Sequence, residues 1–285
     1  MGKIKIGLID WFIDEFHSAC YVPWINKESP ESGEFEVSLA WEHHAKPDGK
    51  DLKTWCKEFG VTPADSMEQV LEQCDGFIVL APKNPEVHEE LVAPVLRTGK
   101  PVYLDKPFAP SRAAAERIFA EADRCGAPIW SSSALRFSDE IIKAKTELFQ
   151  NKPAEFVQVA GGGSSLEEYL IHLVEMLVTL QGPDAARVMY AGKKLNHVMF
   201  LDYNDNRRGV LTMLPLLGYL LLARDGEKVV FEHADTKMFA RLLSEVMQFI
   251  RTGITPVPRE ETIAVSAIVE RMIEAQKRPG EWLAI

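Results

Sequence analysis

The first half of the chain alternates short apolar runs with amphipathic segments. Apolar runs of this length predict buried strands, and a 3.6-residue period between them predicts helices. The predicted strands are Ile4–Ile9, Phe35–Trp41, Gly76–Leu80, Val102–Leu104 and Pro128–Ser131. Such alternation is typical of a doubly wound parallel sheet, so we predict a Rossmann-like dinucleotide-binding domain over residues 1–133.

The second half has a different pattern. A predicted helix, Phe137–Phe149, is followed by a predicted strand, Ala154–Ala160, and by the strongly amphipathic helix Leu166–Leu180. The strands predicted after it have no helices between them and are Arg187–Ala191, Leu195–Asp202, Arg208–Leu214, Tyr219–Ala223 and Lys228–Glu232. Turn signals at Asn204-Asp205-Asn206 and Asp225-Gly226 predict hairpins. Two final helices complete an α+β domain with an open, largely antiparallel sheet over residues 134–285, which makes the fold class α/β with a second α+β domain.

Composition narrows the range of partners. The 285 residues suffice for two cores, and the net charge of −10 argues against an extended phosphate backbone as partner. The four cysteines form no CxxC pair, which favours reduced thiols in the cytoplasm. The most apolar run, Val210–Ala223, is interrupted by Pro215 and Gly218 and is too short to span a bilayer. We therefore expect a cytoplasmic protein that binds neither nucleic acid nor membrane.

A lysine follows the short strand Val102–Leu104. The sequence there is Asp105-Lys106-Pro107, and Pro107 disfavours helical geometry at Lys106. Lys106 is therefore expected at the carboxyl edge of the sheet, where open α/β sheets bind ligands. Position alone leaves two interpretations open, an active-site lysine and a surface lysine in a loop.

The first strand-to-helix turn lacks the glycines of a phosphate-binding loop. A GxGxxG pattern lets backbone amides approach a pyrophosphate. Here Asp10, Phe12 and Glu15 occupy the glycine positions, with Trp11 and Ile13 between them. Their side chains would crowd the pyrophosphate and the carboxylates would repel it, which argues against ordinary dinucleotide binding. Asp10, Trp11, Phe12 and Ile13 remain the candidate cofactor contacts of this turn.

Two further loops end at the same predicted edge. Glu42 follows the second strand, the usual place for an acid that bonds a ribose hydroxyl, although an acid after a strand is also common by chance. Pro82, Asn84 and His88 follow the Gly76–Leu80 strand. They could contact a ligand or cap and flank the next helix.

Two adjacent histidines, His43 and His44, raise the question of a metal. Neighbouring residues of an extended chain point to opposite sides, and no carboxylate or cysteine completes a ligand spacing. We predict no metal site.

The helix predicted over Leu166–Leu180 has one apolar face. Its core-facing leucines are Leu166, Leu170, Leu173, Leu177 and Leu180. Glu168, His172 and Glu175 share the opposite face, and Glu168 and His172 are neighbours at a spacing of four. This is either a solvated face or a histidine oriented by a carboxylate for acid–base chemistry. The glycines Gly161–Gly163 before it would let a ligand approach the backbone.

Taken in order, these motifs resemble the Gfo/Idh/MocA family of glucose–fructose oxidoreductase and inositol dehydrogenase relatives. The matching positions are Asp105-Lys106-Pro107 for its Glu-Lys-Pro, Pro82, Asn84 and His88 for its Pro-Asn…His stretch, and Gly161–Gly163, Glu168 and His172 for its Gly-Gly-Gly and Asp-x-x-x-His helix. The resemblance covers nearly the whole chain. It departs from the family in the missing turn glycines, in Asp105 for glutamate and in Glu168 for aspartate.

The resemblance implies an oxidoreductase that uses NAD or NADP. Lys106 would lie beside the nicotinamide and the substrate hydroxyl, His172 would take the hydroxyl proton, and Glu168 would orient His172 or bind substrate. Glu42 favours NAD, because an acid there repels a 2′-phosphate. Substrates would be sugars, cyclitols or related polyols, and the open sheet would build a homodimer or homotetramer. The alternative is a member that binds a sugar-like ligand, or does non-redox chemistry, without a dinucleotide.

Overall fold

The computed structural model describes residues 2–163 and 165–285 and divides into two compact units. The first comprises the chain up to Ala109, Glu116–Ser131 and Leu242–Val257, and the second comprises Pro110–Ala115, Ser132–Arg241 and Pro258–Ile285.

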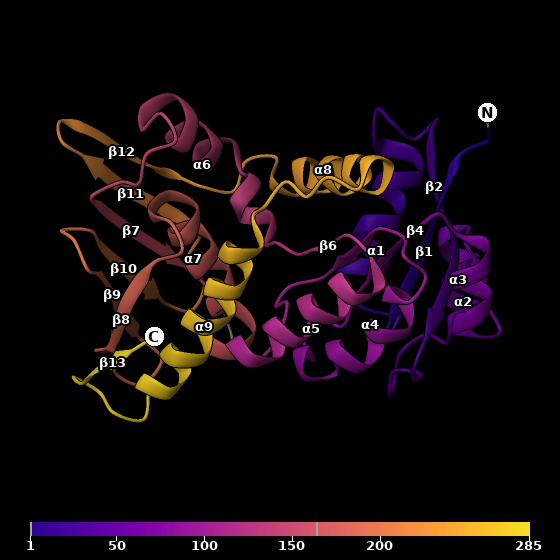
Figure 1. Ribbon diagram of the computed structural model, residues 1–285, viewed down its shortest axis with the longest axis horizontal. Helices are drawn as coiled ribbons and strands as arrows, with labels where there is room; N and C mark the ends of the chain where they lie inside the picture. The colour runs from indigo at the N-terminus through magenta and orange to yellow at the C-terminus, as the bar shows by residue number, and fades with distance from the viewer. Residues whose placement is uncertain (1, 164) are drawn as a thin grey trace. The chain divides into compact units, whose positions relative to one another are not determined.

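The first unit is built on a six-stranded parallel sheet in the order β3-β2-β1-β4-β5-β6 (Figure 1). Its strands are β1 (Ile4–Asp10), β2 (Phe35–Glu42), β3 (Thr62–Pro63), β4 (Gly76–Val79), β5 (Val102–Leu104) and β6 (Ile129–Trp130). The predicted doubly wound parallel sheet is confirmed. Strand order reverses between β1 and β4, so the ligand crevice of this fold lies at their carboxyl ends. The two-residue β3 was not predicted, because so short a strand has no readable period.

Helices follow the strands as the sequence predicted. They are α1 (Phe16–Pro23), which continues as a π-turn over Trp24–Glu28, α2 (Leu52–Phe59), α3 (Met67–Gln73), α4 (His88–Leu96) after a 3-10 turn over Pro85–Val87, and α5 (Arg112–Cys125). Local chemistry sets their ends. Asp51 caps α2 by accepting the Thr54 amide at 2.7 Å, and Gly60 ends it with φ 71°.

One segment that the sequence analysis assigned to the second domain belongs to the first unit. Leu242–Val257, most of helix α8 (Met238–Thr252), belongs to the first unit. Phe249 lies edge-on to Trp130 at 5.9 Å, and the Arg251 guanidinium lies 5.0 Å from the Phe35 ring centre. The apolar face of α8 is therefore buried against strands that come from the other end of the sequence.

The second unit contains a seven-stranded sheet in the order β12-β11-β7-β10-β9-β8-β13 (Figure 1). Its strands are β7 (Phe156–Gly161), β8 (Ala185–Tyr190), β9 (His197–Tyr203), β10 (Arg208–Met213), β11 (Leu220–Asp225), β12 (Lys228–His233) and β13 (Trp282–Ala284). Among the strand pairs of the described residues in this sheet, β7–β10 is parallel and the others are antiparallel, which confirms the largely antiparallel prediction. The C-terminal strand β13 was not predicted.

Helices α7 (Leu166–Gln181) and α9 (Arg259–Ala275) pack on this sheet and on each other. The segment before them forms a 3-10 turn, η3 (Ala134–Phe137), and α6 (Asp139–Lys143), which continues as a π-turn over Ala144–Leu148. The predicted leucine face of α7 is buried throughout, with no leucine more than 3% exposed. Burying a leucine contributes about 1.5–3 kcal/mol, so this face anchors the unit.

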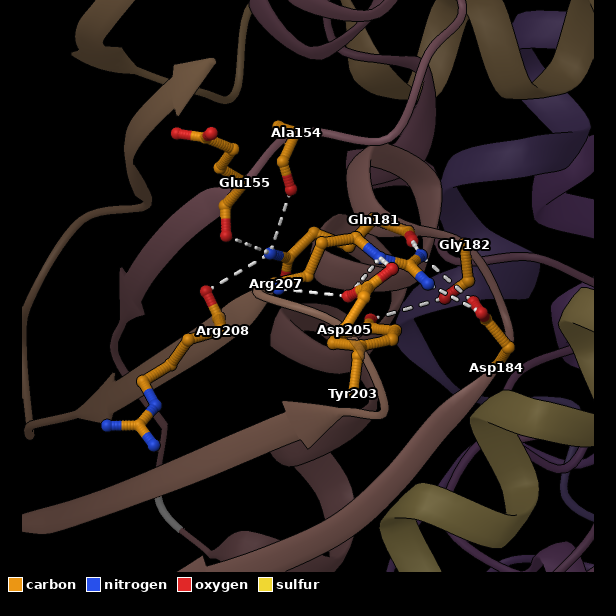
Figure 2. Close-up of polar contacts among 9 residues, drawn as sticks. All are labelled: Ala154, Glu155, Gln181, Gly182, Asp184, Tyr203, Asp205, Arg207 and Arg208. Atoms are coloured by element: carbon orange, nitrogen blue, oxygen red, sulfur yellow. Dashed lines mark hydrogen bonds and ion pairs between the residues drawn. The ribbon is translucent and has the colours of Figure 1, made fainter. Parts of the chain in front are cut away.

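The C-terminal end of α7 is held by buried polar contacts (Figure 2). The Gln181 side chain is fully buried, and its amide nitrogen donates to the carbonyls of Ala154, Glu155 and Arg208 at 3.1–3.4 Å. These carbonyls flank β7 and β10, the parallel pair at the middle of the sheet. A single side chain therefore fixes the end of the helix against two strands.

Arg207 completes this anchor (Figure 2). It pairs with Asp184 at 2.5 Å and with Asp205 at 2.8 Å, and its guanidinium lies 4.3 Å from the ring centre of Tyr203. The Tyr203 hydroxyl donates to the carbonyl of Gly182 just beyond the helix. With its C-terminal end fixed in this way, α7 holds a defined axial position in the unit.

Candidate functional site

Lys106 stands directly after β5 and is only 8% exposed. Asp105 before it is fully buried, and its carboxylate is hydrogen-bonded to Nδ1 of His17. Burial alone would raise the pKa of Asp105, but the His17 and Lys106 charges together hold it below its ordinary value. Lys106 therefore has an ionised carboxylate as its neighbour.

His17 was missed by the sequence analysis. It lies on the first turn of α1, 8% exposed, and its ring stacks on Tyr21 with 5.1 Å between centres. The Tyr103 hydroxyl adds a contact of 3.4 Å to Asp105. The only signal in the sequence was that α1 begins at the carboxyl edge where β5 also ends. The pairing itself spans 88 residues and follows from the fold.

The loop after β4 uses its polar groups internally. His88 is fully buried, with Nδ1 3.2 Å from the carbonyl of Phe108 and Nε2 3.1 Å from that of Ala81. Burial lowers the pKa of His88, and the neutral ring that this favours carries one N–H, which can donate to one of these two carbonyls. Asn84 donates to Glu86 at 3.1 Å, and Pro82 is buried. A ligand contact by His88 or Asn84 would compete with these bonds.

The turn after β1 forms a closed structure. The His43 and His44 amides bond to the carbonyls of Asp10 and Trp11 at 2.9 and 3.0 Å, so the β1–β2 pairing extends beyond both strands. Trp11 also stacks on His43 with 4.4 Å between ring centres, and Phe12 lies edge-on to Trp11 at 6.3 Å. Aromatic rings thus occupy the turn.

Asp10 is the most constrained group of this turn. Its side chain is fully buried, and within the described residues neither carboxylate oxygen has a hydrogen-bond partner. Burial raises the pKa of Asp10 well above its ordinary value, and the Asp105 carboxylate raises it further. A carboxyl group in this position is stable when it is protonated.

Glu42 accepts two backbone amides. Oε2 accepts from Ile13 at 3.1 Å and Oε1 from Leu52 at 3.1 Å, which ties the turn to the start of α2. A ribose hydroxyl could reach Glu42 only through the remaining lone pairs of these oxygens. Ile13 is itself fully buried, and its amide is already bonded to the Glu42 carboxylate.

These observations test whether the turn fits a dinucleotide. Between the turn and the loop after β4, lined by residues that include Asp10, Phe12 and Asn84, the cavity measures about 10 Å³. That is the space of a single water molecule at most. The turn as folded does not accommodate a pyrophosphate.

In the second unit, His172 lies on α7 with its ring partly buried. Its Nδ1 is 2.7 Å from Oγ of Ser133, which is fully buried and also accepts the Leu135 amide at 3.3 Å. The rings of Tyr169 and Tyr219 lie 6.1 Å from the imidazole centre. The group described on Nδ1 is therefore a serine from η3, where sequence analysis expected the carboxylate of Glu168. Glu168 is half-buried, and its amide is capped by Ser165.

Glu175 corrects the expected polar face of α7. One of the two interpretations of the face it shares with Glu168 and His172 was a solvated surface, but Glu175 is 3% exposed and pairs with Arg136 at 2.7 Å. Arg136 also pairs with Glu261 of α9, and Glu175 accepts the Ser133 amide at 3.3 Å. A helix with a single apolar face would expose its other side to solvent. In α7 that other side is covered by η3 and α9. The ion pairs support Ser133, and through it His172.

The three glycines before α7 make room for the chain itself. A Cβ on Gly162 would lie 2.5 Å from the carbonyl oxygen of Leu217, and one on Gly163 would lie 2.5 Å from Cβ of Tyr169. On Gly161 it would meet the Tyr219 ring at 2.7 Å. These glycines therefore allow the chain at the end of β7 to pack closely against its neighbours, and they would do so with or without a ligand.

The described residues contain neither a metal-binding cluster nor a membrane-spanning helix. No group of three or more His, Cys, Asp or Glu side chains that could hold a metal occurs in residues 2–163 and 165–285. Within the same residues, no helix has the length and apolar character needed to cross a bilayer.

Residues 28–132 match the family model described as an oxidoreductase family with an NAD-binding Rossmann fold. Over these residues the chain is similar to the Gfo/Idh/MocA family.

Curated relatives cover part of the sequence. An uncharacterized oxidoreductase of Schizosaccharomyces pombe is 27% identical over 208 residues, 66% of this chain and 55% of that protein. The uncharacterized oxidoreductase YhhX of Escherichia coli is 30% identical over 125 residues, 44% of this chain and 35% of that protein. The chain thus spans about half and about a third of these two relatives.

Solved structures share the whole fold. Scyllo-inositol dehydrogenase from Lactobacillus casei superimposes with a TM-score of 0.82 at 13% identity, covering 99% of this chain and 98% of that one. Myo-inositol dehydrogenase from Corynebacterium glutamicum gives 0.79 at 13% identity, covering 99% of both chains. At such identities the likeness is one of fold.

Proposed function

We propose that the chain is an oxidoreductase that acts on a hydroxyl group of a sugar, cyclitol or related polyol, with His172 as its proton acceptor. The observation that carries the proposal is the imidazole of His172, partly buried and fixed through Nδ1 by a fully buried serine. The match of residues 28–132 to an oxidoreductase family with an NAD-binding Rossmann fold supports the reaction class and NAD as the redox partner. The inositol dehydrogenases that share the fold support the substrate class.

The geometry of His172 suits proton transfer at one atom. With Nδ1 bonded to Ser133, we assign Nε2 as the nitrogen that meets the substrate. When Nδ1 carries its proton and donates to Oγ of Ser133, Nε2 carries the lone pair that can accept the proton of a hydroxyl group. The Ser133 oxygen can accept this bond together with the one from Leu135.

Lys106 is proposed as a second acid–base group. It is nearly buried, and the Asp105 carboxyl group, whose pKa is lowered by His17 and Lys106, precedes it in the chain. An ammonium group stabilises the negative charge that develops on an oxygen as its proton leaves. Glu168 is proposed to bind substrate, since Ser133 is the group described on the imidazole.

The test is a substitution at His172 with a matched histidine as control. Turnover is screened on a panel of inositols and sugars with NAD and NADP. His172→Ala is expected to lower it by about 100-fold or more, the usual contribution of a general base. The control is His197→Ala, because His197 is also bonded through Nδ1, to Tyr190 at 2.8 Å in the same unit. Full turnover in a folded His172→Ala variant would refute the role.

A second candidate function is favoured by the closed turn after β1. The chain would bind a sugar-like ligand, or do non-redox chemistry on it, without a dinucleotide. The cavity of about 10 Å³ at the turn is the observation behind it. Fluorescence titration separates the candidates. Binding of NADH or NADPH at micromolar levels would exclude the second, and absence of binding at millimolar levels would exclude the first.

The open sheet of the second unit is proposed as the surface for a homodimer or homotetramer. Val229 and Phe231 on the edge strand β12 are 57% and 70% exposed, which is unusual for large apolar side chains on one short strand. Light scattering coupled to gel filtration tests this. Phe231→Asp is expected to lower the measured mass, and an unchanged mass would place the interface elsewhere.

A further inference from the structure

Glu15 stands in the third glycine position of the turn and points inward. Its side chain is 11% exposed, and two lysines meet its carboxylate. Nζ of Lys46 lies 3.0 Å from Oε1, and Nζ of Lys83 lies 3.1 Å from Oε2. Each carboxylate oxygen therefore has its own ammonium partner.

The two lysines come from different loops of the same edge. Lys46 follows β2 and Lys83 follows β4, and these strands flank β1, from which the turn with Glu15 begins. Lys46 is further held by the carbonyl of Asp14 at 2.8 Å. Three loops thus converge on one anion, at the carboxyl ends where this fold binds phosphate.

An anion held by two ammonium groups is an arrangement that suits phosphate. Lysine binds phosphate as a point charge, and charge-assisted bonds of about 2.7–2.9 Å hold the oxygens. In this structure the anion is the carboxylate of Glu15, a residue of the protein itself. The Ile13 and Glu15 amides of the turn are also engaged elsewhere, so these lysines are cations that a phosphate group could use without the missing glycines.

We propose that Glu15 is an internal anion that occupies a two-lysine phosphate site, and that phosphorylated ligands bind there when Glu15 is displaced. The inference concerns Lys46 and Lys83 and does not rest on the function proposed for His172. It accounts for a dinucleotide family member whose turn is closed, because the chain fills the phosphate position with its own carboxylate. Dinucleotides and smaller phosphate esters share the required chemistry.

Calorimetric binding tests the proposal without any turnover. Inorganic pyrophosphate and NADH are titrated into the wild type and Glu15→Gln, which keeps the size of the side chain and removes its charge. Glu15→Gln is expected to bind pyrophosphate about tenfold more tightly, since two partly exposed ion pairs no longer compete. Glu58→Gln is the matched control, because Glu58 pairs with Lys50 at 2.6 Å on an exposed surface of the same unit. It is expected to bind like the wild type.

A combined variant identifies the lysines as the binding groups. Glu15→Gln with Lys46→Met and Lys83→Met is expected to lose the gain. Equal affinities of the wild type and Glu15→Gln would overturn the proposal, and so would a gain that persists without the lysines. A gain for pyrophosphate and NADH supports a dinucleotide site, and a gain for pyrophosphate alone supports a site for a smaller ligand. Glu15→Ala gives a second measurement if the glutamine variant does not fold.

Discussion

Arg136 is the group whose removal should disturb the second unit most. Its side chain is 6% exposed and lies between two carboxylates, those of Glu175 (4%) and Glu261 (13%). Arg136→Met keeps much of the side-chain volume but leaves both carboxylates buried without their cation. Breaking a buried pair by removing one partner costs about 3–5 kcal/mol.

The expected consequence is a large fall in unfolding temperature. For a chain of this size each kcal/mol corresponds to roughly 2–4 °C, so the variant should melt roughly 6–20 °C lower. The matched control is Arg224→Met, whose pair with Glu155 at 3.0 Å is about half exposed on both sides. An exposed pair contributes about 0–1 kcal/mol, so the control should melt near the wild type.

Calorimetry and urea unfolding measure both variants, and a third variant tests the cause. Arg136→Met combined with Glu175→Gln and Glu261→Gln has no uncompensated charge left, and it is expected to recover at least half of the lost stability. The reasoning is refuted if Arg136→Met costs no more than Arg224→Met. It is also refuted if the combined variant is the least stable, because the loss would then come from packing or hydrogen bonds.

Other outcomes concern the buried groups of both units. The raised pKa of Asp10 means that the folded chain keeps a proton which the unfolded chain releases above about pH 4. Asp10→Asn should therefore be more stable than the wild type at neutral pH, and the difference should vanish towards pH 3; thermal melts across pH check this, and equal curves would contradict it. Gln181→Ala removes the side-chain amide that donates to three backbone carbonyls, and it should lower the free energy of unfolding, measured in urea, by about 1–3 kcal/mol. Leu170→Ala, at a fully buried core position, should cost about 2–5 kcal/mol in the same assay, and a loss below that of an exposed leucine such as Leu195 would contradict the packing described.

The architecture of the first unit was readable from sequence because its signals are local. The apolar runs that predict β1, β2, β4 and β5 are strands in the structure. Short elements were missed. A two-residue strand such as β3 forms only because β2 offers it backbone partners.

The candidate site likewise contains residues that the sequence could place and residues that it could not. Lys106 could be placed at the carboxyl edge from Pro107 and the preceding strand alone. His17 could not be paired with Asp105, because their contact depends on the order of strands in the sheet. Glu175 was misplaced because the 3.6-residue period shows one apolar face and cannot show how many neighbours surround a helix.

The sequence by itself determined the strand–helix pattern, the loss of the turn glycines and the residue types at the sheet edge. Only the tertiary structure decided what the side chains in those glycine positions contact. Glu15 meets Lys46 and Lys83 because three loops, far apart in the chain, end at one edge of a parallel sheet. Hydrophobic periodicity sets each element separately, whereas ion pairs between loops form only after the strands have taken their order.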